Sequence, residues 1–194
     1  MSRREEMLFK NTEFVGYSDL NKKPGFQMGM HRTKDGRYYL YTACFRDNGF
    51  NIVDVTDPAK PVAKWVEGDW VGEVHDGQSL AKLQVADGKL IACYGGTMRV
   101  LHGTHEQPYW GGFKIYDIET DPLNPKLLGQ FECEDGPGVH RSFYNGGDYA
   151  YIMGSKRNFR GYILRIVDIS DPSSPTEVGS WWADGQYLGN KKAS

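Results

Sequence analysis

The 194-residue sequence has no uninterrupted apolar run of 18 residues, so it holds no candidate membrane-spanning helix. It also lacks a basic stripe, because the formal net charge is −2 and the charges of both signs are interspersed, which leaves no electrostatic footprint for a nucleic acid. No apolar stretch follows the two N-terminal arginines, so no signal peptide is indicated. These absences predict a cytoplasmic protein that binds neither membranes nor nucleic acids.

Helical periodicity is missing as well, since no stretch keeps an apolar repeat of 3.6 residues over three turns, and this disfavours a doubly wound α/β fold. There is no Walker loop, no Ser-His-Asp nucleophile elbow and no CxxC pair. Only three cysteines occur, Cys44, Cys93 and Cys133. Their number is odd, they are widely spaced, and the first two lie in apolar runs, so free buried thiols are expected there.

What the sequence does contain is 24 glycines, nine prolines and 13 % aromatic residues, a mixture typical of many short strands joined by tight turns. One pattern occurs three times, at residues 50–61, 113–125 and 164–175. Each copy is a strand-like run with an Asp, followed by Asp-Pro-x-x-Pro. Proline cannot donate to a strand ladder and the Asp before it can bond the turn backbone, so the motif ends a strand and reverses the chain.

A matching strand precedes each copy, after an Asp-Gly or Gly-Gly-Asp turn of the kind found in hairpins, and another follows each copy. With one more strand before the glycine turn, each unit has four strands, which we name a to d in chain order. A four-stranded unit that recurs every ~40–50 residues is typical of a β-propeller blade. The sequence therefore predicts an all-β fold, a β-propeller segment of about three four-stranded blades.

The motif divides the chain into blade 1 (27–70), blade 2 (71–136) and blade 3 (137–184), with an insertion in blade 2 at about 97–112. An N-terminal stretch (1–26) precedes them and residues 185–194 form a tail or the start of a missing blade.

Residues 12–17 resemble residues 176–181, a predicted strand d, and are expected to serve as an N-terminal closing strand. Three blades do not close a ring, because propellers have four to eight. Either the chain is a fragment of a longer propeller, or two or more copies form a homo-oligomer that completes the ring, or the blades form an open solenoid.

The runs 51–58 (NIVDVTDP) and 164–172 (LRIVDISDP) resemble the LVIVD repeat of bacterial and archaeal β-propeller proteins. The resemblance covers roughly residues 27–184. It implies the propeller fold and no particular activity, since that family is defined by its repeat.

One histidine precedes the predicted strand a of each blade: His31, His75 and His140. Strand a is innermost in a blade, so three equivalent histidines are expected to converge on the axis. Converging imidazoles suit a divalent transition metal such as Zn, Fe, Mn or Cu, with an open position for substrate. The arrangement is similar to the axial metal site of carotenoid-cleaving and selenium-binding propellers. A structural role in blade packing is the alternative.

The neighbours Arg32, Asp76 and Arg141 are then candidates for catalytic contacts, either to the ligands or to an anionic substrate. In the insertion, His102 and His105 have a His-x-x-His spacing on a loop, and Tyr109 and Trp110 are placed to cap a ligand mouth. The strand-c aspartates, Asp54, Asp117 and Asp168, are interpreted as structural.

Two functions stay open. The first is a metal-dependent enzyme that acts on a small organic substrate in the axial channel by lytic or oxidative chemistry, without an organic cofactor. The second is a non-catalytic β-propeller platform that binds a partner protein.

Overall fold

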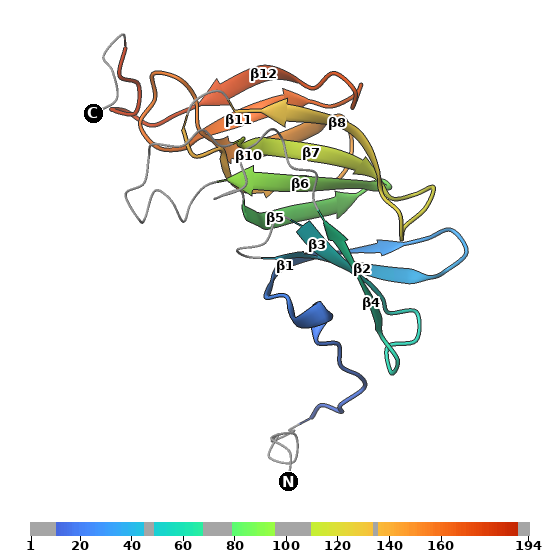
Figure 1. Cartoon of the computed structure of the whole chain (residues 1–194). Coiled ribbons are helices and arrows are strands. Elements are labelled where there is room, and N and C mark those ends of the chain that lie inside the picture. Colours follow the sequence, from blue (N-terminus) through green and yellow to red (C-terminus); the bar gives the residue numbers. More distant parts are fainter. Residues whose placement is uncertain (1–10, 45–48, 68–78, 96–109, 134–135, 190–194) are drawn as a thin grey trace.

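The computed structural model describes residues 11–44, 49–67, 79–95, 110–133 and 136–189, and all that follows refers to these (Figure 1). They form twelve strands and one short 3₁₀ helix, η2 (Leu20–Lys22), with no α-helix among the residues described. Accordingly, no helix in these ranges is long and apolar enough to cross a membrane. The prediction of an all-β chain is confirmed.

The strands form three four-stranded antiparallel sheets, and each sheet runs in chain order from strand a to strand d. Blade 1 consists of β1 (Gly25–Arg32), β2 (Tyr38–Cys44), β3 (Gly49–Asp54) and β4 (Val62–Glu67). Blade 2 consists of β5 (Ser79–Ala86), β6 (Lys89–Gly95), β7 (Gly112–Asp117) and β8 (Lys126–Glu132). Blade 3 consists of β9 (Val139–Phe143), β10 (Tyr149–Gly154), β11 (Ile163–Asp168) and β12 (Thr176–Trp181).

The register of strands b and c is the same in all three blades. The strand-c aspartate pairs with Tyr39 in blade 1, with Lys89 in blade 2 and with Tyr149 in blade 3. These three residues are therefore equivalent, and every other position can be matched between blades by counting from them.

The repeated aspartates hold the turns, as the sequence predicts. The carboxylate of Asp54 accepts a hydrogen bond from the Thr56 N–H at 2.9 Å, and Asp117 and Asp168 accept the equivalent bonds. The Asp of each Asp-Pro-x-x-Pro motif in turn accepts from the N–H two residues on, as Asp171 does from Ser173. Short polar side chains that bond the backbone in this way favour a turn over a continued strand.

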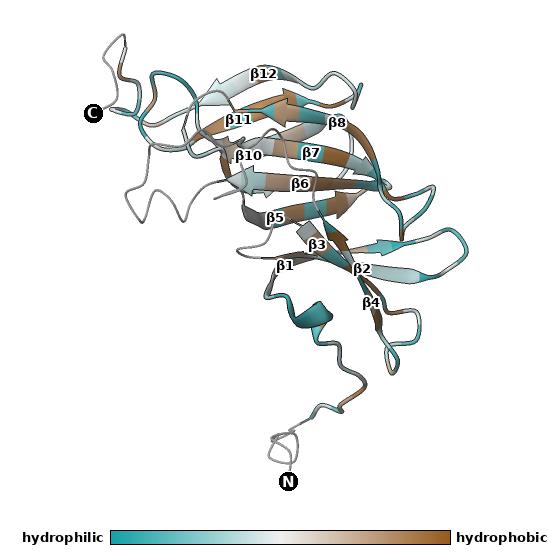
Figure 2. Cartoon of the chain, in the orientation of Figure 1, coloured by the Kyte–Doolittle hydropathy of each residue, from teal (hydrophilic) through white to brown (hydrophobic). Residues whose placement is uncertain are grey.

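Adjacent blades pack face to face, and we name the face of a blade that points toward the following blade its leading face and the opposite one its trailing face. Tyr39, Tyr41, Ala43, Phe50 and Ile52, on the leading face of blade 1, are fully buried against blade 2. A second core forms between the leading face of blade 2 and the trailing face of blade 3. Figure 2 shows the apolar residues concentrated along the strands and the turns hydrophilic.

The three cysteines are free and buried. Burial raises the pKa of the Cys93 thiol to about 12 and that of the Cys133 thiol to about 11. Both are therefore protonated at neutral pH and pack as small apolar groups between blades 2 and 3.

Residues 11–19 form no strand, so the predicted closing strand stays a prediction. The segment nevertheless lies against blade 1. A Cβ on Gly16 would collide with the backbone carbonyl of Pro58 in the turn between β3 and β4. Gly129, in strand d of blade 2, meets the carbonyl of Pro172 in blade 3 in the same way. Gly16 therefore lies where the strand d of a preceding blade would lie.

Candidate functional site

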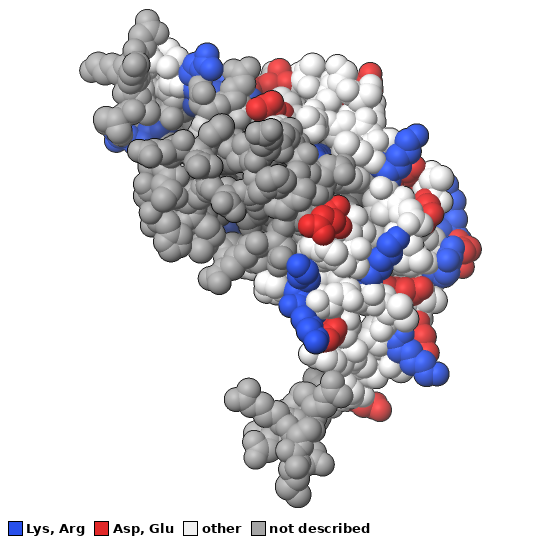
Figure 3. Space-filling view, viewed as in Figure 1, with Lys and Arg blue, Asp and Glu red and all other residues white. Residues whose placement is uncertain are grey.

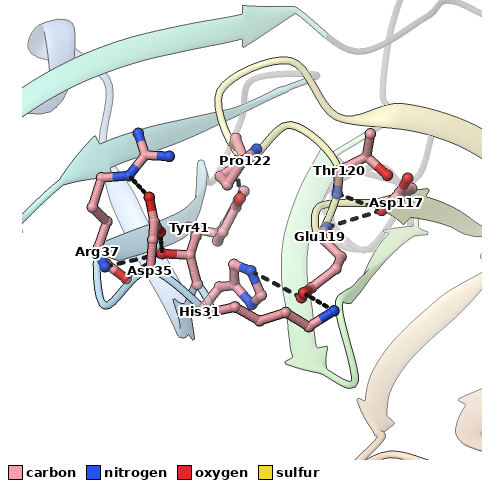
Figure 4. Close-up of polar contacts among 10 residues, drawn as sticks. His31, Asp35, Arg37, Tyr41, Asp117, Glu119, Thr120 and Pro122 are labelled. Carbon is pink, nitrogen blue, oxygen red and sulfur yellow. Dashed lines mark hydrogen bonds and ion pairs between the residues drawn. The ribbon is translucent and has the colours of Figure 1, made fainter.

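His31 is buried between blades 1 and 2, near the C-terminal end of β1 (Figure 4). Its Nε2 lies 3.5 Å from the Glu119 carboxylate of blade 2, and the other oxygen of Glu119 lies 3.0 Å from the Lys34 ammonium. No hydrogen-bond partner for Nε2 is present among the described residues. A buried imidazole beside a carboxylate from the next blade is an inter-blade contact, which fits the structural alternative.

His140 lies near the N-terminal end of β9, and its ring stacks on Tyr162 with 5.0 Å between the ring centroids. Burial, and then the charges of Arg141 and Lys82, lower the pKa of His140. The imidazole is therefore neutral at neutral pH, the form that a metal or a proton donor requires.

The two histidines are not at equivalent positions, and this part of the prediction is wrong. His31 pairs with Tyr39, at the start of strand b. His140 lies opposite Met153 and Gly154, at the end of strand b in its own blade. The two levels differ by four to five residues, roughly 15 Å along the strand direction, whereas a Zn–N bond is about 2.0–2.1 Å long. His31 and His140 therefore cannot converge on one ion.

The reason lies in strand a. It is eight residues long in blade 1 and five in blade 3, and the bulges in the two blades fall at different places. The glycine upstream of each histidine marks a similar distance along the sequence. The strand length and the bulge decide which residue of strand b the histidine faces, and these differ between the two blades.

Of the remaining predicted site residues, Arg32 and Arg141 are exposed. The Arg32 guanidinium lies over the Tyr38 ring, 5.7 Å from its centroid. His75 and Asp76 lie outside the described residues, so their predicted roles stay predictions. Over the described ranges there is no group of three His, Cys, Asp or Glu side chains that could hold a metal ion.

We expect that purified protein retains no ion whose binding depends on both His31 and His140, because the register holds them at different levels. Elemental analysis of the wild type and of the double variant His31→Ala/His140→Ala tests this, with circular dichroism as the control for folding. Stoichiometric Zn, Fe, Mn or Cu that disappears in the folded double variant would contradict the expectation.

The insertion of blade 2 places its histidines, His102 and His105, and also Tyr109 outside the described residues. Trp110 is described, and the prediction that it caps a ligand mouth is wrong. Its indole is buried in the core between blades 1 and 2, 5.7 Å from the Tyr94 ring and edge-on to it.

A buried ion-pair network supports strand c of blade 3. The Arg165 guanidinium, almost fully buried, contacts the Glu177 carboxylate at 2.6 and 2.8 Å and donates to the Ser155 carbonyl. Lys156 binds the other oxygen of Glu177. Burial alone would raise the pKa of Glu177, but the hydrogen bonds from Lys156 and Arg165 outweigh it, so the pKa is lowered.

Sequence reasoning missed an aromatic cluster at one end of blade 3, made of Phe159, Trp182 and Tyr187. The centroid of the Phe159 ring lies 4.9 Å from that of Trp182 and 5.2 Å from that of Tyr187. Trp182 is 41 % exposed and Tyr187 56 % exposed. The signal in the sequence is weak, because the three residues come from two segments that only the fold brings together.

The aromatic cluster is held by main-chain contacts. Phe159 and Tyr187 form an isolated antiparallel bridge. The Gln186 side chain donates to the carbonyls of Arg160 and Tyr162 and accepts from the Ala183 N–H, and the Leu188 N–H donates to the Asn158 carbonyl. These contacts order the cluster although its rings face solvent.

On the face shown in Figure 3, basic and acidic side chains of the described residues are interspersed. No field of one sign therefore marks a site for a highly charged ligand on that part of the surface.

Comparison with protein families gives a match to the LVIVD repeat at residues 38–66 and 145–182. The first stretch covers β2, β3 and most of β4, and the second covers β10, β11 and β12. A comparison with curated proteins gives no match.

Proposed function

Starting from the premise that the chain is an LVIVD-repeat protein built of β-propeller-like blades, we propose that it is a binding platform for a partner protein. The observation that carries the proposal is the ordered aromatic cluster in which Trp182 and Tyr187 are exposed and pack on the half-buried Phe159. Exposed aromatic side chains gathered in one place are typical of protein–protein contacts.

Aromatic rings suit this role because each offers a large apolar area at a low cost in side-chain entropy. The bridge between Phe159 and Tyr187 and the hydrogen bonds of Gln186 order the rings before a partner arrives. Preorganisation of this kind lowers the entropy lost on binding and leaves more of the contact energy as affinity. The partner surface that fits is a short apolar segment, which can pack on the exposed sides of the Trp182 and Tyr187 rings.

Selection from a displayed peptide library on the immobilised full chain tests this proposal. We expect enrichment of peptides rich in apolar residues. Trp182→Ala or Tyr187→Ala should weaken their binding at least about tenfold, as expected for a central aromatic contact. Binding is measured by titration calorimetry with the enriched peptides.

Val62→Ala is the matched control, because Val62 is equally apolar and 67 % exposed but lies on blade 1. It should leave peptide affinity unchanged. A library that yields no enriched peptide, or peptides that bind both aromatic variants as well as the wild type, would refute the proposal.

A further inference from the structure

The leading face of blade 3 is apolar and uncovered. Its residues are Tyr149, Tyr151 and Met153 of β10, Leu164 and Ile166 of β11, and Trp181 of β12, which share this face by their register. Trp181 is 63 % exposed and Tyr149 44 %. Phe143 of β9, paired with Tyr151, extends the same face and is also exposed.

Most of the equivalent positions of the other two blades are buried. Trp181 corresponds to Phe131 of blade 2, which is 9 % exposed, and Leu164 corresponds to Phe113, which is fully buried. In blade 1 the corresponding tyrosines, Tyr39 and Tyr41, are buried as well. In both cases the cover is the trailing face of the following blade. In both interfaces within the chain, therefore, the surface that fits a leading face is the trailing face of another blade.

Among the described residues, the trailing face of blade 1 is packed against no other blade. Met28 and Met30 lie on this side of β1, opposite Thr42 and Leu40 of β2, and both are exposed. Met28 is 61 % exposed, whereas Leu83, the equivalent residue of blade 2, is fully buried against blade 1. An exposed alternating row of large apolar side chains on an innermost strand indicates an interface.

Polar groups match across the same pair of faces. The Tyr41 hydroxyl of blade 1 donates to the Pro122 carbonyl in blade 2, at 2.8 Å. Tyr151 occupies the position of Tyr41 in blade 3, since both pair with the strand-c isoleucine. Pro58 occupies the position of Pro122 in blade 1. A blade 1 docked on blade 3 therefore places a carbonyl opposite the Tyr151 hydroxyl.

We propose that the occupant of the leading face of blade 3 is blade 1 of a second copy of this chain. The contact joins two different surfaces, and it closes with two copies about a twofold axis when the three blades of each copy span half of the ring. Three blades from each copy then close a ring of six, within the four to eight that propellers use. The aromatic cluster takes no part, since the proposal uses Trp181 and not Trp182.

The N-terminal segment competes for this interface. Gly16 packs on the turn at Pro58, where strand d of the preceding blade belongs. In the ring, Gly179 in β12 of the second copy packs on the Pro58 carbonyl in place of Gly16. This contact is equivalent to the one between Gly129 and the Pro172 carbonyl within the chain. A Cβ on Gly179 meets only the Ile166 side chain, so this strand is free to dock. Residues 11–17 must leave before the ring closes.

The mass in solution tests the proposal. Sedimentation equilibrium of the full chain should give twice the 22.0 kDa of one copy at tens of micromolar. Trp181→Glu and Met28→Glu, each on one of the two faces, should each give the mass of a single copy. An equimolar mixture of these two variants should regain the two-copy mass, because one contact of the pair stays intact.

Val62→Glu is the matched control, since Val62 is as exposed as Trp181 but lies on neither free face, and it should keep the two-copy mass. Both charged variants replace exposed side chains, so each single copy should stay folded, with the β-sheet circular dichroism of the wild type, although the loss of association lowers its unfolding temperature. Gly16→Val, which removes the competing segment, should tighten association several-fold.

A single-copy mass for both the wild type and Gly16→Val overturns the proposal. A mixture of the two face variants that stays at one copy overturns it too, and so do open multimers larger than two copies. If Gly16→Val weakens association, the N-terminal segment is a strand of the assembled blade, and the proposed exchange with β12 is wrong.

Discussion

Gly129→Val is expected to lower the free energy of unfolding by about 3 kcal/mol, because overpacking at this position cannot relax easily. A Cβ on Gly129 meets the Pro172 carbonyl and the Ser173 backbone, and both belong to a turn that two aspartates hold in place. The β8 strand must therefore move away from blade 3, which loosens the core between the two blades. Urea unfolding followed by tryptophan fluorescence measures the change.

Gly179→Val is the control for this experiment. Gly179 holds the same position in strand d of blade 3, but the nearest atom to its Cβ would be a side-chain carbon of Ile166 at 3.5 Å. A valine there has space in a single copy and should change stability by less than about 1 kcal/mol, measured at a concentration where one copy prevails. Equal losses for the two valines would contradict the account, because only Gly129 has a following blade to collide with.

Arg165→Ala is expected to cost about 3 kcal/mol of unfolding free energy at neutral pH, since it removes one partner of a mostly buried ion pair. The Glu177 carboxylate keeps Lys156 but loses both contacts to the guanidinium. The Arg165 guanidinium also lies over the Phe131 ring, with its central carbon 4.8 Å from the ring centroid, and alanine leaves that space empty. The measurement is again urea unfolding.

The pH dependence separates the charge from the packing. In the wild type the lowered pKa of Glu177 stabilises the fold above the ordinary value of 4.5, and this contribution is lost as the pH falls through the folded-state pKa. In Arg165→Ala the carboxylate no longer gains from that partner, so protonation costs the variant less. The stability difference between the two proteins should shrink below about pH 4.5 and persist as the packing loss alone.

Arg165→Met is the companion variant, because it keeps a long apolar side chain that can fill the space beside Phe131, while it removes the charged guanidinium and its contacts. It should be less destabilised than Arg165→Ala and show the same convergence in acid. A difference from the wild type that does not depend on pH would assign the whole effect to packing and contradict a role for the Glu177 charge.

The blades could be predicted from the sequence because their signals are local. An Asp beside a proline bonds the backbone two residues on, and that needs no distant partner. The alternation along β11 likewise follows from burial of every second residue, such as Val167, in one blade interface. The same turn motif occurs in each blade, so three copies predict the same four-stranded unit.

The candidate site could not be predicted in the same way, because it depends on register and on contacts between distant segments. His31 and His140 share a motif with their upstream glycines, but a difference in strand length and bulge position sends them to opposite ends of their strands. The loop residues before Trp110 suggest an exposed position for it, whereas its indole belongs to the core beside Tyr94. The aromatic cluster joins residues 159 and 187, which no local pattern links.

In the part of the chain that the structure describes, each strand of the three sheets pairs with its neighbours in the chain, apart from a single bridge between Gly95 and Gly138, and each blade packs on its neighbours in the series. Apart from the connection between β6 and β7, which spans residues 96–111, the strands of each blade are joined by short connections, so each ladder forms without closing a long loop. Stability is then close to a sum of blade terms and of couplings between adjacent blades. A destabilising substitution at the interface between blades 2 and 3 should therefore let blade 3 unfold, while blades 1 and 2 stay folded and packed on each other.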